Sequence, residues 1–202
     1  MLADVLLVVA GYLIGSIPSG VVVVSVARGE DIRAQGSGNI GATNVWRTYG
    51  KSLGIPVAVL DVAKGFAPAL VGSLVGGDWV GVLAGAAAML GHARPVYLGF
   101  SKGGKMVATA GGVTLALAPL AAVTSLGLWI VAFAIVRYAS VASIVTAAAL
   151  PVFCFLYGAP GPVVGFAAVA AVAVIALHHQ NMRRLFAGTE PRFNRRGRGI
   201  GS

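Results

Sequence analysis

Long apolar runs are the feature of this chain that most restricts its fold. A helix that crosses a bilayer needs roughly 20 mostly apolar residues, and such runs occupy residues 3–27, 53–76, 79–98, 138–157 and 161–180. The first run is too long for the core of a signal peptide and lacks a basic start, so we interpret it as a span. With 57% hydrophobic and 10% charged residues, the sequence predicts an all-α, polytopic integral membrane protein.

The number of spans depends on the further apolar run at residues 107–136. This run is either one long tilted helix or two short helices that meet near Pro119, because proline disfavours helix continuation. Cytoplasmic loops carry the excess of Lys and Arg, and only two short helices place the basic C-terminal tail on the same side as the other basic loops. All of the 15 basic residues except Lys64 then face the cytoplasm. We predict seven transmembrane helices, with the N-terminus out and the C-terminus in.

The rest of the composition excludes several classes of partner. The net charge of +9 would suggest nucleic acid in a soluble protein, but here the basic residues lie beside spans, where they set topology or contact anionic lipid. Cys154 is the only cysteine, and no His, Cys, Asp or Glu cluster has the spacing of metal ligands. We predict one domain over residues 1–202, with a flexible basic tail at 189–202, no cofactor, no metal and no nucleic acid.

The loop "GSGNIGATNVWRTYGK" at residues 36–51 is rich in hydrogen-bond donors between two apolar runs. Its glycines at 36, 38 and 41 permit positive φ and close approach of the backbone to a ligand. Side chains suited to phosphate or hydroxyl oxygens are Ser37, Asn39, Thr43, Asn44 and Arg47. A well-turned loop without a ligand is the alternative, but the density of donors favours an anion site.

A second candidate anion site is Gly103–Gly104–Lys105, directly before the apolar helix expected to begin near Val107. Free backbone N–H groups, the positive helix end and a lysine would meet there, which favours phosphate. With Gly99 the spacing is G-x-x-x-x-G-K, but Met106 stands where a P-loop needs Ser or Thr, so an NTPase is rejected. The alternative is a plain interfacial loop whose lysine extends to water.

Three pairs of polar residues have helical spacing. His178 and Asn181 share a face at the end of the last span, as do Ser140 and Ser143. The alternatives are an interfacial or capping role for the histidine and close helix packing for the serines. Asp61 and Lys64 lie inside the second span, where charges are costly unless paired, so we expect them to neutralise each other.

Together these stretches resemble the bacterial acyl-phosphate:glycerol-3-phosphate acyltransferase family (PlsY), nearly end to end. The segment 36–47 is similar to the family signature GSGNxGATNxxR, and 61–65 to its D-x-x-K-G motif. The segments that resemble its first-helix motif, phosphate loop and C-terminal motif are 15–20, 103–109 and 178–185. Met106 stands where the family usually has glycine.

The resemblance implies transfer of a fatty acyl group from acyl phosphate to the sn-1 hydroxyl of glycerol 3-phosphate, giving lysophosphatidic acid and phosphate in phospholipid synthesis. It implies an active site at the cytoplasmic face of the bacterial inner membrane, with membrane lipid as a further partner. Carried over by motif, the catalytic residues are Ser37, Arg47, Lys105, Ser143, His178 and Asn181. The phosphate-binding residues are Gly38, Asn39, Thr43, Asn44, Gly103, Gly104 and Lys105.

An acyl phosphate is a reactive mixed anhydride, so positioning and charge stabilisation suffice without an acyl-enzyme. We predict no Ser-His-Asp triad, because none of the acidic residues fits the ordered motifs of the enzymes that use one. The hydroxyl proton leaves either to His178 or to a substrate phosphate, with Lys105 and Arg47 stabilising charge.

Three other functions remain as alternatives. A transporter of a phosphorylated anion would use basic residues and broken helices too, but repeat symmetry and polar groups near the midplane are expected of it. An acyl-CoA-dependent acyltransferase should carry H-x-x-x-x-D, and no aspartate lies five residues after any histidine of this chain. A non-catalytic packing subunit would not need so many matched polar motifs.

Overall fold

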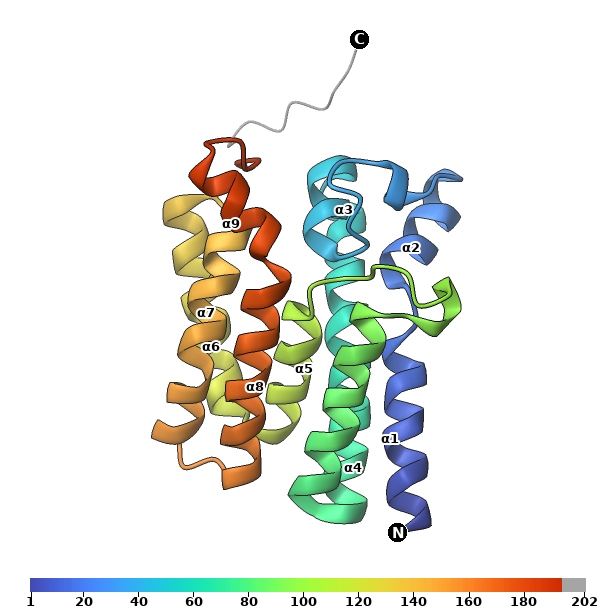
Figure 1. The fold of residues 1–202 in the computed structure, drawn as a ribbon, viewed down its shortest axis with the longest axis vertical. Coiled ribbons are helices and arrows are strands. Elements are labelled where there is room, and N and C mark those ends of the chain that lie inside the picture. Colours follow the sequence, from blue (N-terminus) through green and yellow to red (C-terminus); the bar gives the residue numbers. More distant parts are fainter. Residues whose placement is uncertain (194–202) are drawn as a thin grey trace.

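The apolar runs form helices that lie side by side along one axis (Figure 1). This computed structural model describes residues 1–193, and that part of the chain contains helices and no strand, so the all-α prediction is confirmed. The α-helices are α1 (Leu2–Gly15), α2 (Ser19–Arg28), α3 (Ala42–Tyr49), α4 (Lys51–Ala93), α5 (Val107–Leu117), α6 (Pro119–Val136), α7 (Ala139–Leu156), α8 (Gly161–Leu177) and α9 (His179–Phe186). Two short 3-10 turns are η1 (Ile32–Ala34) and η2 (Val96–Leu98).

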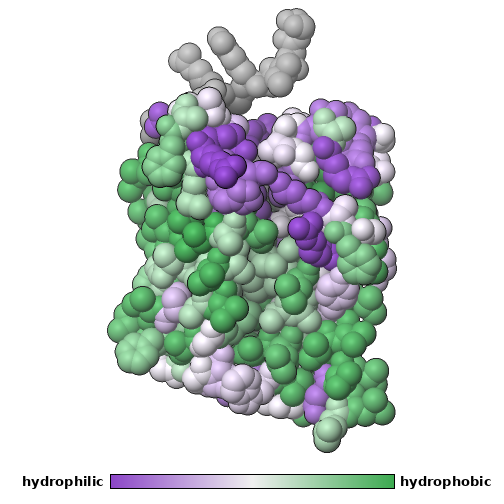
Figure 2. Space-filling view, viewed as in Figure 1, coloured by the Kyte–Doolittle hydropathy of each residue, from purple (hydrophilic) through white to green (hydrophobic). Residues whose placement is uncertain are grey.

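Hydrophilic residues gather at the end of the bundle that holds α3 and α9, whereas apolar residues cover its flank (Figure 2). By length and apolar composition, four segments of the described chain are able to cross a membrane, or five if α8 and α9 count as one span across their 51° bend. Helix α5 has only 11 residues, about 16 Å of rise, which is less than a hydrocarbon core. The apolar flank and these helices are those of an integral membrane protein.

Helix α4 is a hairpin of two antiparallel legs. Its backbone leaves helical geometry at Gly77, where φ is 74° and ψ is −172°. Gly72 on the first leg faces Gly81 on the second, close enough for a Cβ at 72 to lie 3.0 Å from the Cα of 81. The two runs predicted at 53–76 and 79–98 are therefore separate segments that turn at one glycine.

The first apolar run, expected to be a single span, is interrupted at its proline. Helix α1 ends at Gly15 and α2 begins at Ser19, with Pro18 at the break. The carbonyl of Ile17 in this break accepts a hydrogen bond from Lys64 Nζ at 3.0 Å. The same carbonyl accepts from Ser19 N at 2.9 Å, so the buried lysine is a second donor to the backbone at the break.

The ambiguous run at 107–136 forms two helices. Helix α5 ends at Leu117, α6 begins at Pro119, and Ala118 between them is non-helical, with φ of −149° and ψ of 71°. Lys105 before α5 and Arg137 after α6 both lie at the polar end, because each is linked there to the segment after α9 or to α9 itself. The two helices therefore run in opposite directions.

The segment after α9 returns over the polar end of the bundle. The N–H of Phe193 donates to the carbonyl of Arg137 at 3.0 Å. The Phe193 ring meets the rings of Trp46 and Phe133 edge-on, with centroids 6.3 and 5.1 Å away. The first residues of the segment predicted as a flexible tail, 189–193, therefore pack against the bundle; residues 194–202 lie outside the described residues.

Candidate active site

A cavity of about 420 Å³ opens between the helices beneath the polar end. Its upper part is lined by polar and charged side chains from four regions: the 36–47 loop and helix, the turn before α5, the start of α7, and the α8–α9 bend. Its lower part is apolar and formed by α5, α6, α7 and α8; it includes Leu115, Val123, Leu126, Leu150 and Val174. The cavity therefore has one end for a charged group and another for a hydrocarbon chain.

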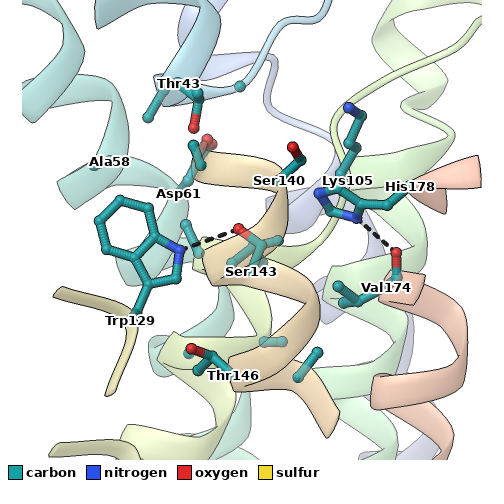
Figure 3. Close-up of a pocket in the computed structure, with 18 of the residues that line it drawn as sticks. Thr43, Ala58, Asp61, Lys105, Trp129, Ser140, Ser143, Thr146, Val174 and His178 are labelled. Carbon is teal, nitrogen blue, oxygen red and sulfur yellow. Dashed lines mark hydrogen bonds between the residues drawn. The ribbon is translucent and has the colours of Figure 1, made fainter. Parts of the chain in front are cut away.

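Most of the predicted site residues meet at this cavity, although they lie far apart in sequence. Those that line it are Ser37, Asn39, Thr43, Asn44, Arg47, Lys105, Ser143, His178 and Asn181. Gly38, Gly103 and Gly104 are not among the lining residues. Figure 3 shows Lys105 and His178 side by side at the upper end, above Ser143 and Thr146 on α7.

The 36–44 loop is held together by two asparagine side chains. Asn44 is buried, and its Nδ2 donates to the carbonyls of Gln35 (3.0 Å) and Asn39 (2.9 Å) while its Oδ1 accepts from Ser37 N (2.9 Å). Both N–H groups of the Asn44 amide are thus used inside the protein. Gly36 and Gly38 have the positive φ values that their sequence context predicts, whereas Gly41 does not.

Asn39 links this loop to the second glycine-rich turn. Its Nδ2 donates to the carbonyl of Gly103 at 3.2 Å, and its Oδ1 accepts from Gly41 N at 2.9 Å. One N–H of the Asn39 amide is therefore already engaged. In this geometry Asn39 and Asn44 organise the 36–44 loop. Asn44 has no free N–H left to donate to a phosphate, whereas Asn39 keeps one.

The expectation of free N–H groups at Gly103 and Gly104 is wrong. Gly103 N donates to the carbonyl of Ala93, and Gly104 N to that of His92, both at 2.9 Å. The reason is that the chain returns directly alongside the end of α4, whose last carbonyls need donors. The sequence spacing predicted that a helix starts here. It could not show that the N–H groups of Gly103 and Gly104 would donate to carbonyls at the end of α4.

The N-terminus of α5 keeps its capacity for an anion. Within residues 1–193 no side chain caps this helix end, and the early residues Val107 and Ala108 line the cavity, so the positive helix end lies beside it. Met106 at the N-cap has φ of 67°, in the region that favours glycine, and its side chain is buried in the apolar core. The methionine therefore does not narrow the anion site.

Two basic side chains complete the polar end. Lys105 Nζ donates to Asn181 Oδ1. Burial, together with the positive charge of Arg184, lowers the pKa of Lys105 to about 8. The guanidinium of Arg47 lies 4.9 Å from the ring centroid of Phe193, and burial lowers its pKa as well. Within residues 1–193 neither cation has a carboxylate at ion-pair distance, so both are left to bind anionic ligands.

Glu190 is a buried hub that sequence reasoning missed. Its Oε1 accepts from Ser140 Oγ at 2.8 Å and from Asn181 Nδ2 at 2.6 Å, and its Oε2 accepts from Arg184 Nε at 2.8 Å. Burial raises the pKa of Glu190, but these hydrogen bonds and the Arg184 charge outweigh burial and hold the pKa below its ordinary value. The carboxylate therefore orients the amide of Asn181, whose Oδ1 accepts the hydrogen bond from Lys105.

Trp129 on α6 was also missed, and it determines the orientation of Ser143. The indole Nε1–H donates to Ser143 Oγ at 3.1 Å (Figure 3). Serines within apolar helices commonly donate back to the carbonyl four residues earlier, as Ser16 does to Tyr12. Ser143 donates no side-chain hydrogen bond to another of residues 1–193, so its O–H is available to a group in the cavity.

His178 is buried at the bend between α8 and α9, and its hydrogen bond indicates its tautomer. Its Nδ1 lies 2.7 Å from the carbonyl of Val174, and a carbonyl accepts only, so Nδ1 carries the proton. In the neutral ring Nε2 is then a free acceptor. This geometry suits a histidine that receives a proton from a hydroxyl group.

The intramembrane charges pair as predicted. Lys64 Nζ lies 2.7 Å from Asp61 Oδ1, and both side chains are buried. His92 adds a third buried group, with Nδ1 3.7 Å from the same oxygen. Asp61 and His92 both line the cavity, so this cluster lies directly beneath the polar end.

Comparisons with known proteins point to one family. Residues 5–188 match the family model described as glycerol-3-phosphate acyltransferase. Relatives of that name include proteins from Geobacter sulfurreducens (47% identical; 96% of this chain and 99% of that one) and Geobacter metallireducens (52% identical; 96% and 99%). Another, from Synechococcus sp. strain JA-2-3B'a(2-13), is 45% identical over 97% of this chain and 98% of its own.

Two solved structures have the same fold. Both are of PlsY (YgiH), described as an integral membrane glycerol 3-phosphate acyltransferase. Its glycerol 3-phosphate form superposes with a TM-score of 0.90 at 43% identity, covering 95% of this chain and 96% of that one. Its lysophosphatidic acid form gives a TM-score of 0.86 at 41% identity, with the same coverage.

Proposed function

The chain belongs to the glycerol-3-phosphate acyltransferase family, and from that premise we propose that it moves a fatty acyl group from an acyl phosphate to the sn-1 hydroxyl of glycerol 3-phosphate. The products are lysophosphatidic acid and inorganic phosphate. The observation that carries this proposal is the two-ended cavity, cationic above and apolar below. A fatty acyl phosphate has the same division, with an anion at one end and a hydrocarbon chain at the other.

The polar end offers enough positive charge for the phosphate groups of both substrates. The start of α5, with Lys105, supports one phosphate, and Arg47 with the hydroxyls of Ser37 and Thr43 supports another. Charge-assisted hydrogen bonds from such groups are shorter and stronger than neutral ones. The apolar walls below then hold the acyl chain, which places the reacting carbonyl near the level of Ser143.

In the proposed reaction, the sn-1 hydroxyl oxygen attacks the acyl carbonyl and forms the ester C–O bond. The bond between the acyl carbon and the phosphate oxygen breaks, and phosphate leaves with the bonding electrons. Ser143, oriented by Trp129, donates to the developing oxyanion. The hydroxyl proton passes to His178 Nε2 or to a substrate phosphate, and the free acceptor at Nε2 supports the first route.

We also propose that residues 1–202 form one domain with seven spans in the bacterial inner membrane, the N-terminus out and the C-terminus in. The two legs of α4 and the reversal between α5 and α6 support this count. The polar end, which would then face the cytoplasm, carries exposed basic residues such as Arg28, Lys102 and Arg183, as cytoplasmic surfaces do.

The test measures acyl transfer by the purified protein in lipid. The protein is given glycerol 3-phosphate with either palmitoyl phosphate or palmitoyl-CoA, and lysophosphatidic acid is quantified. Lysophosphatidic acid should form from the acyl phosphate only, and Lys105→Ala should abolish it. Product from the CoA thioester alone would refute the proposed donor. If neither donor gives product, uptake of glycerol 3-phosphate by vesicles would test the transporter alternative.

A further inference from the structure

The pair Gly103–Gly104 needs a physical reason for its two glycines. Neither residue has a positive φ, so backbone conformation does not require glycine there. Neither lines the cavity, and both N–H groups are bound to carbonyls at the end of α4. Close approach to a phosphate is therefore not the reason either, and packing remains.

The side chain nearest to the position of a Cβ on Gly104 is that of His92. A Cβ at position 104 would overlap the His92 imidazole, and its three nearest atoms would be Nε2, Cε1 and Cδ2 of that ring. Position 103 differs, because a Cβ there would meet the backbone carbonyl of His92, the Cδ of Pro95 and the backbone of Ala93. The two adjacent glycines thus face different groups: Gly104 faces the imidazole, and Gly103 faces backbone atoms and Pro95.

The His92 ring is itself buried beside a carboxylate. It is 3% exposed, and its Nδ1 lies 3.7 Å from Asp61 Oδ1, across the hairpin of α4. Asp61 is paired with Lys64, which also binds the carbonyl of Ile17. A continuous series of buried contacts therefore runs from the break in the first span to the turn that carries Lys105.

We propose that His92 is a positioning residue for this turn. Its imidazole fills the volume that any side chain at 104 would need, its carbonyl binds Gly104 N, and the adjoining Lys105 is thereby set at the cavity. Asp61 faces the ring from the other leg of α4, 3.7 Å from its Nδ1. On this view the second glycine of the pair is required by the histidine and not by the substrate.

The experiment compares Gly104→Ala, His92→Ala and the double variant with the wild type. Alone, Gly104→Ala displaces the turn, so the KM for glycerol 3-phosphate should rise on the order of 10- to 100-fold with a lower Tm. In the His92→Ala background the same substitution meets no imidazole. Its further effect on KM should therefore be less than about threefold, and Tm should not fall further.

The matched control is Gly103→Ala, because a Cβ at position 103 would meet backbone atoms and Pro95 and not the imidazole. His92→Ala should not relieve it, so its cost should be equal in the two backgrounds. His92→Asn, which keeps an amide toward Asp61 and removes Nε2 and Cε1, serves as the second relieving variant if His92→Ala does not fold.

An equal penalty of Gly104→Ala with and without the imidazole would overturn the inference, as would a Gly104→Ala protein indistinguishable from wild type. The KM measurement rests on the proposed acyltransferase function, because it requires turnover. The Tm measurement does not, because steric relief is visible in unfolding even of a protein without turnover. An inactive wild type with rescued stability would therefore refute the function and leave the positioning role supported.

Discussion

The charge of Lys105 makes the anion site sensitive to pH. Its pKa is lowered to about 8 in the free protein by burial and neighbouring positive charge, so the ammonium is lost as pH rises through that value. A bound phosphate favours the charged form and raises the pKa in the complex. We expect kcat/KM for glycerol 3-phosphate, which reports the free enzyme, to fall above about pH 8, with kcat less affected.

The measurement is a pH profile between 7 and 9.5, corrected for spontaneous hydrolysis of the acyl phosphate. Lys105→Arg should lose the alkaline limb because guanidinium stays protonated. Lys102→Arg is the control, since Lys102 is exposed and binds Gln180 outside the cavity, and it should keep the wild-type profile. An unchanged alkaline limb in Lys105→Arg would assign that limb to another group.

Trp129 should act on catalysis only through Ser143. Trp129→Phe keeps an aromatic ring that can stack on Phe133 and removes the N–H that donates to the serine. Loss of one neutral hydrogen bond, about 0.5–1.5 kcal/mol, predicts a two- to tenfold lower kcat with little change in KM. The same substitution in a Ser143→Ala background should change kcat less than about twofold.

The control for this cycle is Trp79→Phe. Trp79 lies on the exposed side of α4 at the far end of the molecule, 65% exposed, and its loss should leave both constants unchanged. Additive effects of Trp129→Phe and Ser143→Ala would show that the indole acts on the cavity directly.

Which residues could be predicted from sequence depends on how their partners are distributed along the chain. Arg47, Lys105 and His178 lie in dense polar stretches and were identified from them. Glu190 binds Ser140 fifty residues away, and Trp129 binds Ser143 across two helices. Neither carries a local signal of its own, because its role exists only once the helices are packed.

At the scale of elements, the positions of the helix breaks were predictable. Proline at 18 and 119 removes a backbone donor, and these residues flank two of the three interruptions. The third lies at Gly77 between two apolar runs. The antiparallel course of α5 and α6 was argued from charge alone, and the packing of residues 189–193 was not predicted, since a basic, glycine-containing tail resembles a flexible one.

The hairpin of α4 should depend on Gly77. Its φ of 74° with ψ of −172° is a combination nearly confined to glycine, and no atom crowds the site. Gly77→Ala should therefore lower the free energy of unfolding by about 1–3 kcal/mol through backbone strain alone, measured as a lower Tm in detergent.

Gly127→Ala is the matched control. Gly127 also has open space around it but lies in regular helix within α6, where alanine is favoured by about 0.5–1 kcal/mol. Its Tm should equal or exceed that of the wild type. If both variants lose stability alike, Gly77 is needed for packing against lipid or detergent and not for its conformation.

At the scale of the whole molecule, the membrane topology and the chemistry support each other. In the proposed reaction, a donor with a fatty chain enters from the bilayer, whereas glycerol 3-phosphate and phosphate are soluble. A cavity that is polar at one end of the bundle and apolar within it serves both only if that end lies at a membrane–water boundary, which the proposed topology makes the cytoplasmic one. The count of spans therefore bears on function as well as on fold.

The count can be decided by two exposed positions, Asp78 in the α4 turn and Gly161 at the start of α8. With seven spans both face outward, because α5 and α6 cross separately; with 107–136 as a single span they face opposite sides. In a Cys154→Ala background, an impermeant maleimide on intact cells should label Asp78→Cys and Gly161→Cys. It should label Lys102→Cys only after permeabilisation. Labelling of Asp78→Cys but not Gly161→Cys would make residues 107–136 a single tilted span, place residue 183 outside, and remove the argument from the basic loops.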